Sequence, residues 1–186
     1  METVLPALIA VLLAEIGSKT QSFAHVLALA GRSGPALRAL LFTSLAGYGI
    51  AAAGGIVVSQ MIAFEARSLL FGVALLAAGL PMLFKLPKVP SLPDPPSFPR
   101  TVFGFARAQF GDSAQFLVFA LAARGGNPAL AALGGLCAVM VVTGAAVVLA
   151  GDWPKPAVLR GVRAGAGTLL SIAGFLIAIN ALGLTA

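Results

Sequence analysis

Six long runs of apolar residues divide this chain, and each is long enough to cross a lipid bilayer. A membrane-spanning helix needs about 20 mostly apolar residues. The runs cover residues 3–30, 36–63, 68–86, 101–123, 129–150 and 157–184. Because 59% of the 186 residues are hydrophobic and only 10% are charged, few residues remain for a soluble domain. The sequence therefore predicts an all-α membrane protein with six transmembrane helices.

The basic residues predict how these helices are oriented. We assign most of them to the connections after the first, third and fifth runs, which include the adjoining ends of the runs: Arg32, Arg38, Lys85, Lys88, Arg100, Lys155, Arg160 and Arg163. The opposite side holds only Arg67 and Arg124. The positive-inside rule therefore places both termini outside the cytoplasm, and we expect a bacterial inner (plasma) membrane. The net charge of +6 does not indicate a nucleic-acid partner, because the basic residues form no cluster with interleaved aromatic residues.

A proline-rich segment separates the chain into two halves. The segment PKVPSLPDPPSFP, residues 87–99, contains six of the twelve prolines. Proline at this density favours an extended, semi-rigid spacer. The sequence therefore predicts two units, residues 1–86 and 100–186, joined by a cytoplasmic linker.

The two halves carry related motifs. A shift of 94 positions aligns AEIGSKTQ, residues 14–21, with AQFGDSAQ, residues 108–115. Because each half has three spans, the second half must enter the membrane from the opposite side, which makes an inverted repeat. Many secondary transporters have this plan and bind their substrate where the repeats meet, on interrupted helices. Gly17 and Gly111 are the predicted weak points. Eight other glycines are expected to let helices pack closely: Gly47, Gly54, Gly72, Gly79, Gly134, Gly144, Gly165 and Gly174.

The paired motifs place oxygen-bearing side chains inside apolar runs. Residues three or four apart share a helix face, so Glu15 projects with Ser18, and Gln109 with Asp112. If the halves face each other, these four converge. Four further donors come from the same motifs: Gln21, Gln115, Thr20 and Ser113. Such hard ligands suit magnesium, calcium or manganese, and burial would let each carboxyl take up a proton when the ion is absent.

A structural interpretation of these charges stays open. Glu15 and Lys19 have the i, i+4 spacing of an ion pair between neighbouring turns. Asp112 has no basic residue three or four positions away, so its partner is a bound ion or a residue of another helix, for which Lys19 is the nearest candidate. Lys19 would then balance charge at the site. His25, one turn after Gln21, either shuttles protons or packs in the core.

Two classes of intramembrane protease are excluded by residue counts. GRSG, residues 31–34, resembles a rhomboid serine motif, but the histidine required on another span is missing. FGDS resembles an aspartyl protease motif, but Asp94 and Asp152 both lie in connecting segments. We therefore predict neither an enzyme nor a bound cofactor.

The motif E-x-G-D-K-[TS], found twice in degenerate form, resembles that of the GDT family of Golgi and bacterial manganese and calcium transporters, in a cation exchanger superfamily. This resemblance implies that each motif supplies a glutamate and an aspartate to one cation site. Glu15 and Asp112 match these acids. Ser18 stands in place of the first aspartate, Gln109 in place of the second glutamate, and Ser113 with Ala114 in place of the second basic and hydroxyl pair.

The resemblance implies a secondary transporter that exports manganese, or calcium, in exchange for protons. Two acids and Lys19 leave the site with a charge of minus one, where four acids and two bases would leave minus two. Two alternatives remain: a carrier of the same plan for another solute, such as an amino acid, and a non-transporting protein with a structural charge network. The expected partners are the lipid bilayer, the divalent cation and protons, and a homo-oligomer with further copies of the chain stays open.

Overall fold

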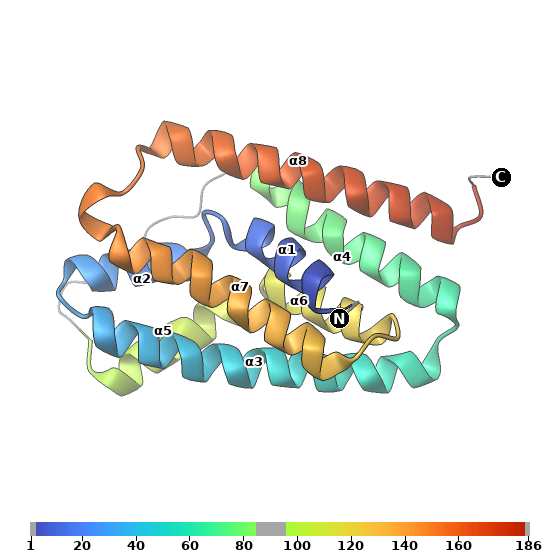
Figure 1. Ribbon diagram of the computed structural model, residues 1–186, viewed down its shortest axis with the longest axis horizontal. Helices are drawn as coiled ribbons and strands as arrows, with labels where there is room; N and C mark the ends of the chain where they lie inside the picture. Colours follow the sequence, from blue (N-terminus) through green and yellow to red (C-terminus); the bar gives the residue numbers. More distant parts are fainter. Residues whose placement is uncertain (1–2, 85–95, 185–186) are drawn as a thin grey trace.

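The computed structural model describes residues 3–84 and 96–184, and all regular secondary structure in those ranges is helical (Figure 1). A short pair of helices followed by two long helices occurs twice. The first half contains α1 (Val4–Glu15), α2 (Lys19–Leu29), α3 (Ser33–Met61) and α4 (Phe64–Phe84). The second half contains α5 (Phe98–Gln109), α6 (Ser113–Ala123), α7 (Pro128–Val148), the short 3-10 helix η1 (Ala150–Asp152) and α8 (Pro156–Ala181).

Four of the described helices, α3, α4, α7 and α8, are long and apolar enough to cross a membrane. The pair α1 and α2 makes a fifth candidate span, bent by 64°. The run predicted at 101–123 is divided between α5 and α6; α6 is short and apolar, whereas α5 carries Arg100 and Arg107 within 12 residues. The described residues thus contain four or five candidate spans, where six were predicted.

Large apolar side chains cover the outer faces of the long helices. More than half of the surface of each of these side chains is exposed: Phe42, Leu45, Ile50 and Val57 on α3, and Leu169, Ile172, Phe175 and Leu176 on α8. A soluble monomer rarely exposes apolar patches of this extent. Together with the long apolar helices, this surface identifies an integral membrane protein.

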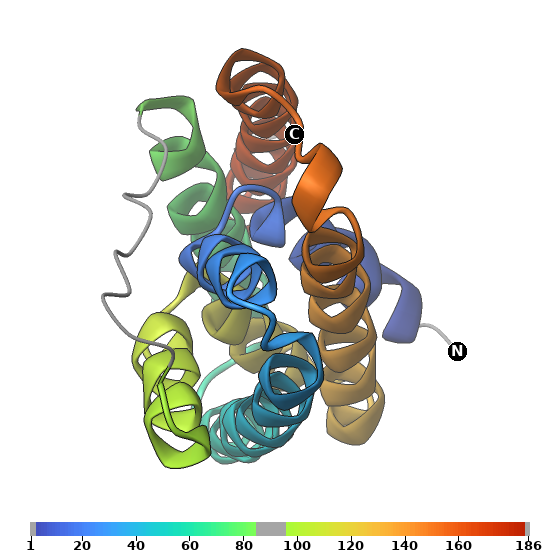
Figure 2. The same cartoon turned by 90° about the vertical axis from the view of Figure 1, so that its left-hand side faces the viewer.

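Helices α4 and α8 form one closely packed pair, α3 and α5 lie on the other side of α2, and α7 lies beside α2 (Figure 2). The backbones of α4 and α8 meet at glycines: Gly72 lies against Gly174, and Gly79 lies against Gly167. A Cβ atom at any of these positions would come within 3 Å of the opposite helix. These contacts agree with the predicted packing role of glycine.

The prediction is wrong for two other glycines. Gly144 on α7 and Gly165 on α8 have no atom within 4 Å of the position that a Cβ would take. Both point away from the neighbouring helices, so glycine content alone did not identify which glycines lie in helix contacts.

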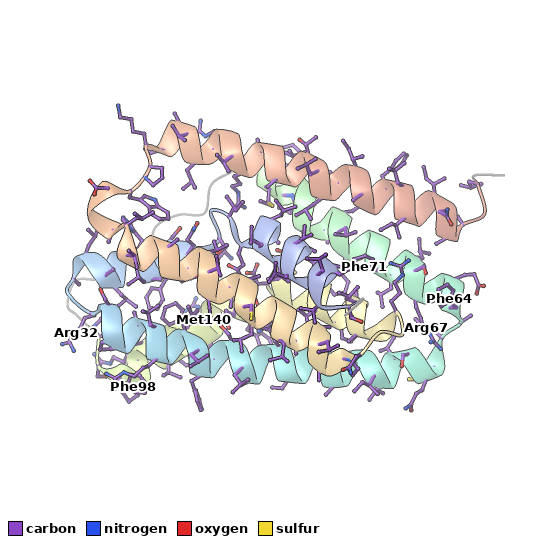
Figure 3. All side chains as sticks on the ribbon, in the orientation of Figure 1. Arg32, Phe64, Arg67, Phe71, Phe98 and Met140 are labelled. Atoms are coloured by element: carbon purple, nitrogen blue, oxygen red, sulfur yellow. The ribbon has the colours of Figure 1, made fainter. Side chains whose placement is uncertain are left out.

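Both described ends of the chain lie at the same end of the bundle. The Thr3 hydroxyl accepts a 3.2 Å hydrogen bond from the amide of Asn127, in the turn before α7, and Asn180 lines a small cavity with Arg124. Figure 3 shows Arg32 and Arg67 at opposite ends of the bundle. The predicted linker lies largely outside the described residues, and α5 begins at Phe98, inside the predicted 87–99 boundary.

Candidate cation site at two helix breaks

The two motifs form the same backbone turn. The amide of Ser18 donates to the carbonyl of Glu15 at 3.0 Å, and the amide of Asp112 donates to the carbonyl of Gln109 at 2.9 Å. The second residue of each turn has extended geometry, with φ −61° and ψ 117° in the first turn and φ −64° and ψ 119° in the second. The third residue, Gly17 or Gly111, has a positive φ of 66° or 72°. These values define type II β-turns, which favour glycine at the third position. Both helices are therefore interrupted at the predicted glycines.

The residue after each glycine begins the next helix. Ser18 caps α2 by accepting a 3.0 Å hydrogen bond from the amide of Gln21, and Asp112 caps α6 by accepting a 2.9 Å bond from the amide of Ser113. Serine and aspartate are favoured at this position because their side-chain oxygen satisfies a free amide of the first turn. The turn and the cap together explain why the two motifs share G-[SD] at their centre.

Glu15 is buried at the end of α1, with 1% of its surface exposed. The Ser18 hydroxyl donates to Glu15 Oε2 at 2.6 Å, and the Tyr48 hydroxyl of α3 donates to Glu15 Oε1 at 3.5 Å. Glu15 and Ser18 therefore do meet, but across a turn instead of along one helix face. The i, i+4 pairing of Glu15 with Lys19 was wrong, because the helix ends between them and the Lys19 side chain is exposed.

The glutamines of the two motifs hold the breaks against the long helices. Gln21 accepts a 2.7 Å hydrogen bond from the amide of Gly17 and donates one of 3.2 Å to the carbonyl of Val142 on α7. Gln109 donates a 2.8 Å bond to the Ser44 hydroxyl of α3. Gln115 packs over α3 so closely that a Cβ atom on Gly47 would collide with its Nε2.

Two cavities meet at Asp112. One, of about 270 Å³, is lined by residues of both motifs: Ser18, Lys19, Gly111, Asp112 and Ser113. The other, of about 640 Å³, is more apolar and opens between α3, α4 and α6, with Asp112 and Gln115 among its polar lining residues. The structure therefore brings Ser18 and Lys19 to one space with Asp112 and Ser113. Glu15 lies behind Ser18, to which it is hydrogen-bonded.

Arg163 also lines the smaller cavity, although the sequence placed it in a loop. It lies two turns inside α8, is 8% exposed, and donates through Nη1 to the carbonyls of Ile16 and Gly17. The prediction failed because Arg163 was counted with the loop residues although it lies inside the run predicted at 157–184; α8 begins at Pro156 and carries Arg163 within the helix. The site therefore contains a second basic group, and its formal charge is zero when Glu15 and Asp112 are both ionised.

Two of the secondary candidates lie farther from this cavity. Thr20 is fully buried on α2, and its hydroxyl has no hydrogen-bond partner among the described residues. The His25 ring packs against Trp153 in a tilted arrangement with ring centroids 4.8 Å apart, and both residues line a separate cavity of about 500 Å³ that reaches Gly17. The nitrogen Nδ1 of His25 is buried and has no partner in the described part of the chain.

Two functional candidates escaped the sequence reasoning. Tyr48 is the only tyrosine of the chain and lies in the middle of an apolar run, which was a usable signal. Arg163 falls inside the predicted run 157–184, so its position within that run was the corresponding signal. Neither residue belongs to a motif, and both reach the site from another helix.

The donor set fits a hard cation in chemistry but carries few charges. Within the described residues no group of three or more His, Cys, Asp or Glu side chains comes together. Carboxylate, hydroxyl, amide and carbonyl oxygens surround the two breaks instead, and these are the ligands that calcium accepts.

The comparisons with known proteins agree with this chemistry. Residues 97–184 match the family model described as divalent cation/proton antiporter GDT1. No curated protein and no solved structure matches the chain. The matched segment contains α5 to α8, and therefore the break at Gly111 and Asp112. The match supports the membership of this chain in the GDT family.

Proposed function

We propose that the chain is a six-span antiporter of two inverted three-helix repeats that exports a divalent cation from the cytoplasm in exchange for protons. Manganese is the first candidate ion and calcium the second. The observation that carries this proposal is the pair of identical glycine turns, each next to one membrane carboxyl group, Glu15 or Asp112. Interrupted helices that place such groups near the bilayer centre are typical of ion-coupled transporters.

Asp112 is proposed as the principal ligand of the ion. Ser113 contacts only its Oδ1, and Asp112 borders both the smaller and the larger cavity, which gives an ion a route to it. Gln115 and Ser18, each lining one of these cavities, supply neutral oxygens. Glu15 is proposed as the proton-coupling group, because it is the more deeply buried acid and its two oxygens already accept hydrogen bonds from Ser18 and Tyr48.

The test is flux of manganese, and separately of calcium, into proteoliposomes under an imposed pH gradient. The wild type is compared with Glu15→Gln and Asp112→Asn, and with Glu65→Gln, an exposed acid at the start of α4, as the matched control. We expect gradient-dependent flux in the wild type and the control, and its loss in both site variants. Absence of wild-type flux for both manganese and calcium would overturn the proposal.

One observation favours a second candidate function. The smaller cavity is lined by Lys19 and Arg163 as well as Asp112, and side chains of both signs are suited to a zwitterionic solute such as an amino acid. The same proteoliposomes distinguish the two functions. An amino acid carrier would exchange a labelled amino acid, and manganese would neither move nor compete.

A further inference from the structure

Arg163 occupies a position at the first break that resembles a cation site. Its Nη1 donates to two carbonyls, those of Ile16 and Gly17, at the carboxyl end of α1. The side chain is buried, and its Nε has no partner among the described residues. The guanidinium is therefore held by the turn, and no carboxylate within residues 3–84 and 96–184 is bonded to it.

The carboxyl end of a helix attracts positive charge. The last carbonyls of a helix have no partner within it and carry a partial negative charge. In transporters with interrupted helices, such carbonyls coordinate the transported or coupling cation. Arginine keeps its proton under all ordinary conditions, so a guanidinium at this place is a positive charge that cannot leave.

The second break differs from the first. Gly111 is exposed and lines both cavities next to Asp112. The two breaks have the same backbone geometry, yet the carbonyls of the first are bonded to Arg163 while the second faces open cavities. The transported ion thus has room at the second break, and it would lie in the same small cavity as the Arg163 side chain.

We propose that the guanidinium of Arg163 acts as a tethered cation. It occupies the place beside the carbonyls of the first break where a free cation could bind, and its charge sets the affinity of the site at Asp112 for the transported ion. This inference rests on the proposed function. Repulsion from Arg163 weakens the binding of a divalent ion and speeds its release. Arg163 is then a residue that sets the affinity for the ion, and the chain binds its ion weakly.

The test of this role is manganese binding to the purified protein. Binding is followed through the electron paramagnetic resonance signal of free manganese. The wild type is compared with Arg163→Gln and with Arg160→Gln, which removes an exposed arginine three residues away on the same helix. Because charges that line one partly buried cavity interact more strongly than charges in water, we expect Arg163→Gln to lower the Kd about tenfold or more. Arg160→Gln should leave it unchanged. Flux assays on the same proteins should show a lower KM and a lower maximal rate for Arg163→Gln alone.

A merely structural role for Arg163 gives a different result. Arg163→Gln would then unfold at a lower temperature, but the folded fraction would bind manganese with the wild-type Kd, and that result would overturn the inference.

If Arg163→Gln does not fold, Arg163→His tests the same charge within one protein, since histidine gains and loses its charge near pH 6.5. We expect the manganese Kd of Arg163→His to fall more steeply with rising pH than that of the wild type. The other ionisable groups at this site, Glu15, Asp112 and Lys19, are the same in both proteins, so the difference between the two slopes reports on position 163. Equal slopes would overturn the inference.

Failure of the proposed function gives a separate pattern. If the wild type binds neither manganese nor calcium, the proposed function fails. Binding by Arg163→Gln in that case would still support the inference, because removal of the tethered cation would have opened the position. No binding by either protein would overturn both.

Discussion

Ser18 donates a 2.6 Å hydrogen bond to Glu15 across the break between α1 and α2, and both side chains are buried. The same hydroxyl accepts the amide of Gln21 and so begins α2. Asp112 has the equivalent capping place at the second break. Each break thus retains one carboxyl group, and at the first break the serine orients the glutamate instead of adding a second charge beside it.

The double role of Ser18 predicts the effect of Ser18→Ala. The substitution removes both a helix cap and a donor to a buried carboxyl group, so the protein should lose about 1–3 kcal/mol of stability. Thermal unfolding in detergent measures this loss. Ser59→Ala is the matched control, because Ser59 is only partly buried and its hydroxyl donates within its own helix, to the carbonyl of Ile56. Equal midpoints for the two variants would contradict the prediction.

The turn at Gly111 makes a second prediction. Gly111 has a φ of 72° and no atom within 4 Å of the place where a Cβ would lie, so Gly111→Ala meets no steric neighbour and suffers only backbone strain. For an L-residue in this conformation the cost is about 1–2 kcal/mol. Gly144→Ala, in a helical position that is equally open, should be neutral or stabilising. Thermal unfolding of both variants checks the difference, which would vanish if the second break were not a glycine turn.

The breaks were predictable because they depend on local sequence. Glycine between a buried polar residue and a capping residue, repeated at a fixed spacing, indicated both interruptions. The side-chain partners were not predictable in the same way. Tyr48 reaches Glu15 across 33 positions, and Arg163 reaches Gly17 across 146 positions. A local sequence motif carries no information about contacts between residues so far apart in the chain.

The pairing of Glu15 with Lys19 is the reverse case, in which local spacing suggested a contact that the structure does not contain. The spacing rule for helix faces holds only while the helix continues, and here the turn at Gly17 rotates Lys19 away from Glu15. Gly17 was expected to interrupt this helix, and an interruption removes the periodicity on which the pairing depends. Helix spacing is therefore no basis for a pairing across a predicted interruption, and the contact between Glu15 and Ser18 forms through the turn instead.

The contact between α4 and α8 leads to a third prediction, which compares substitutions at two glycines of α8. Gly167→Val would place its Cβ within 3 Å of the carbonyl of Gly79, whereas Gly165→Val has no neighbour within 4 Å. Overpacking of a close contact costs about 1–3 kcal/mol or more, so Gly167→Val should lower the unfolding midpoint and the folded yield. Gly165→Val should change neither beyond the small effect of valine in a helix. Similar yields would show that the two helices do not pack through these glycines.

The two motif glutamines make the last prediction, because they occupy equivalent positions and have different surroundings. Gln21→Leu leaves the buried amide of Gly17 without its 2.7 Å partner and removes the link to Val142, so we expect a loss of about 1–3 kcal/mol in stability. Gln115 lines the larger cavity beside Asp112, so Gln115→Leu should instead raise the KM for manganese while the unfolding midpoint changes less. Thermal unfolding and flux are measured on both proteins. If both variants lost stability equally and kept the wild-type KM, Gln115 would have a structural role like that of Gln21, and the ion would have to find its neutral oxygens elsewhere at the second break.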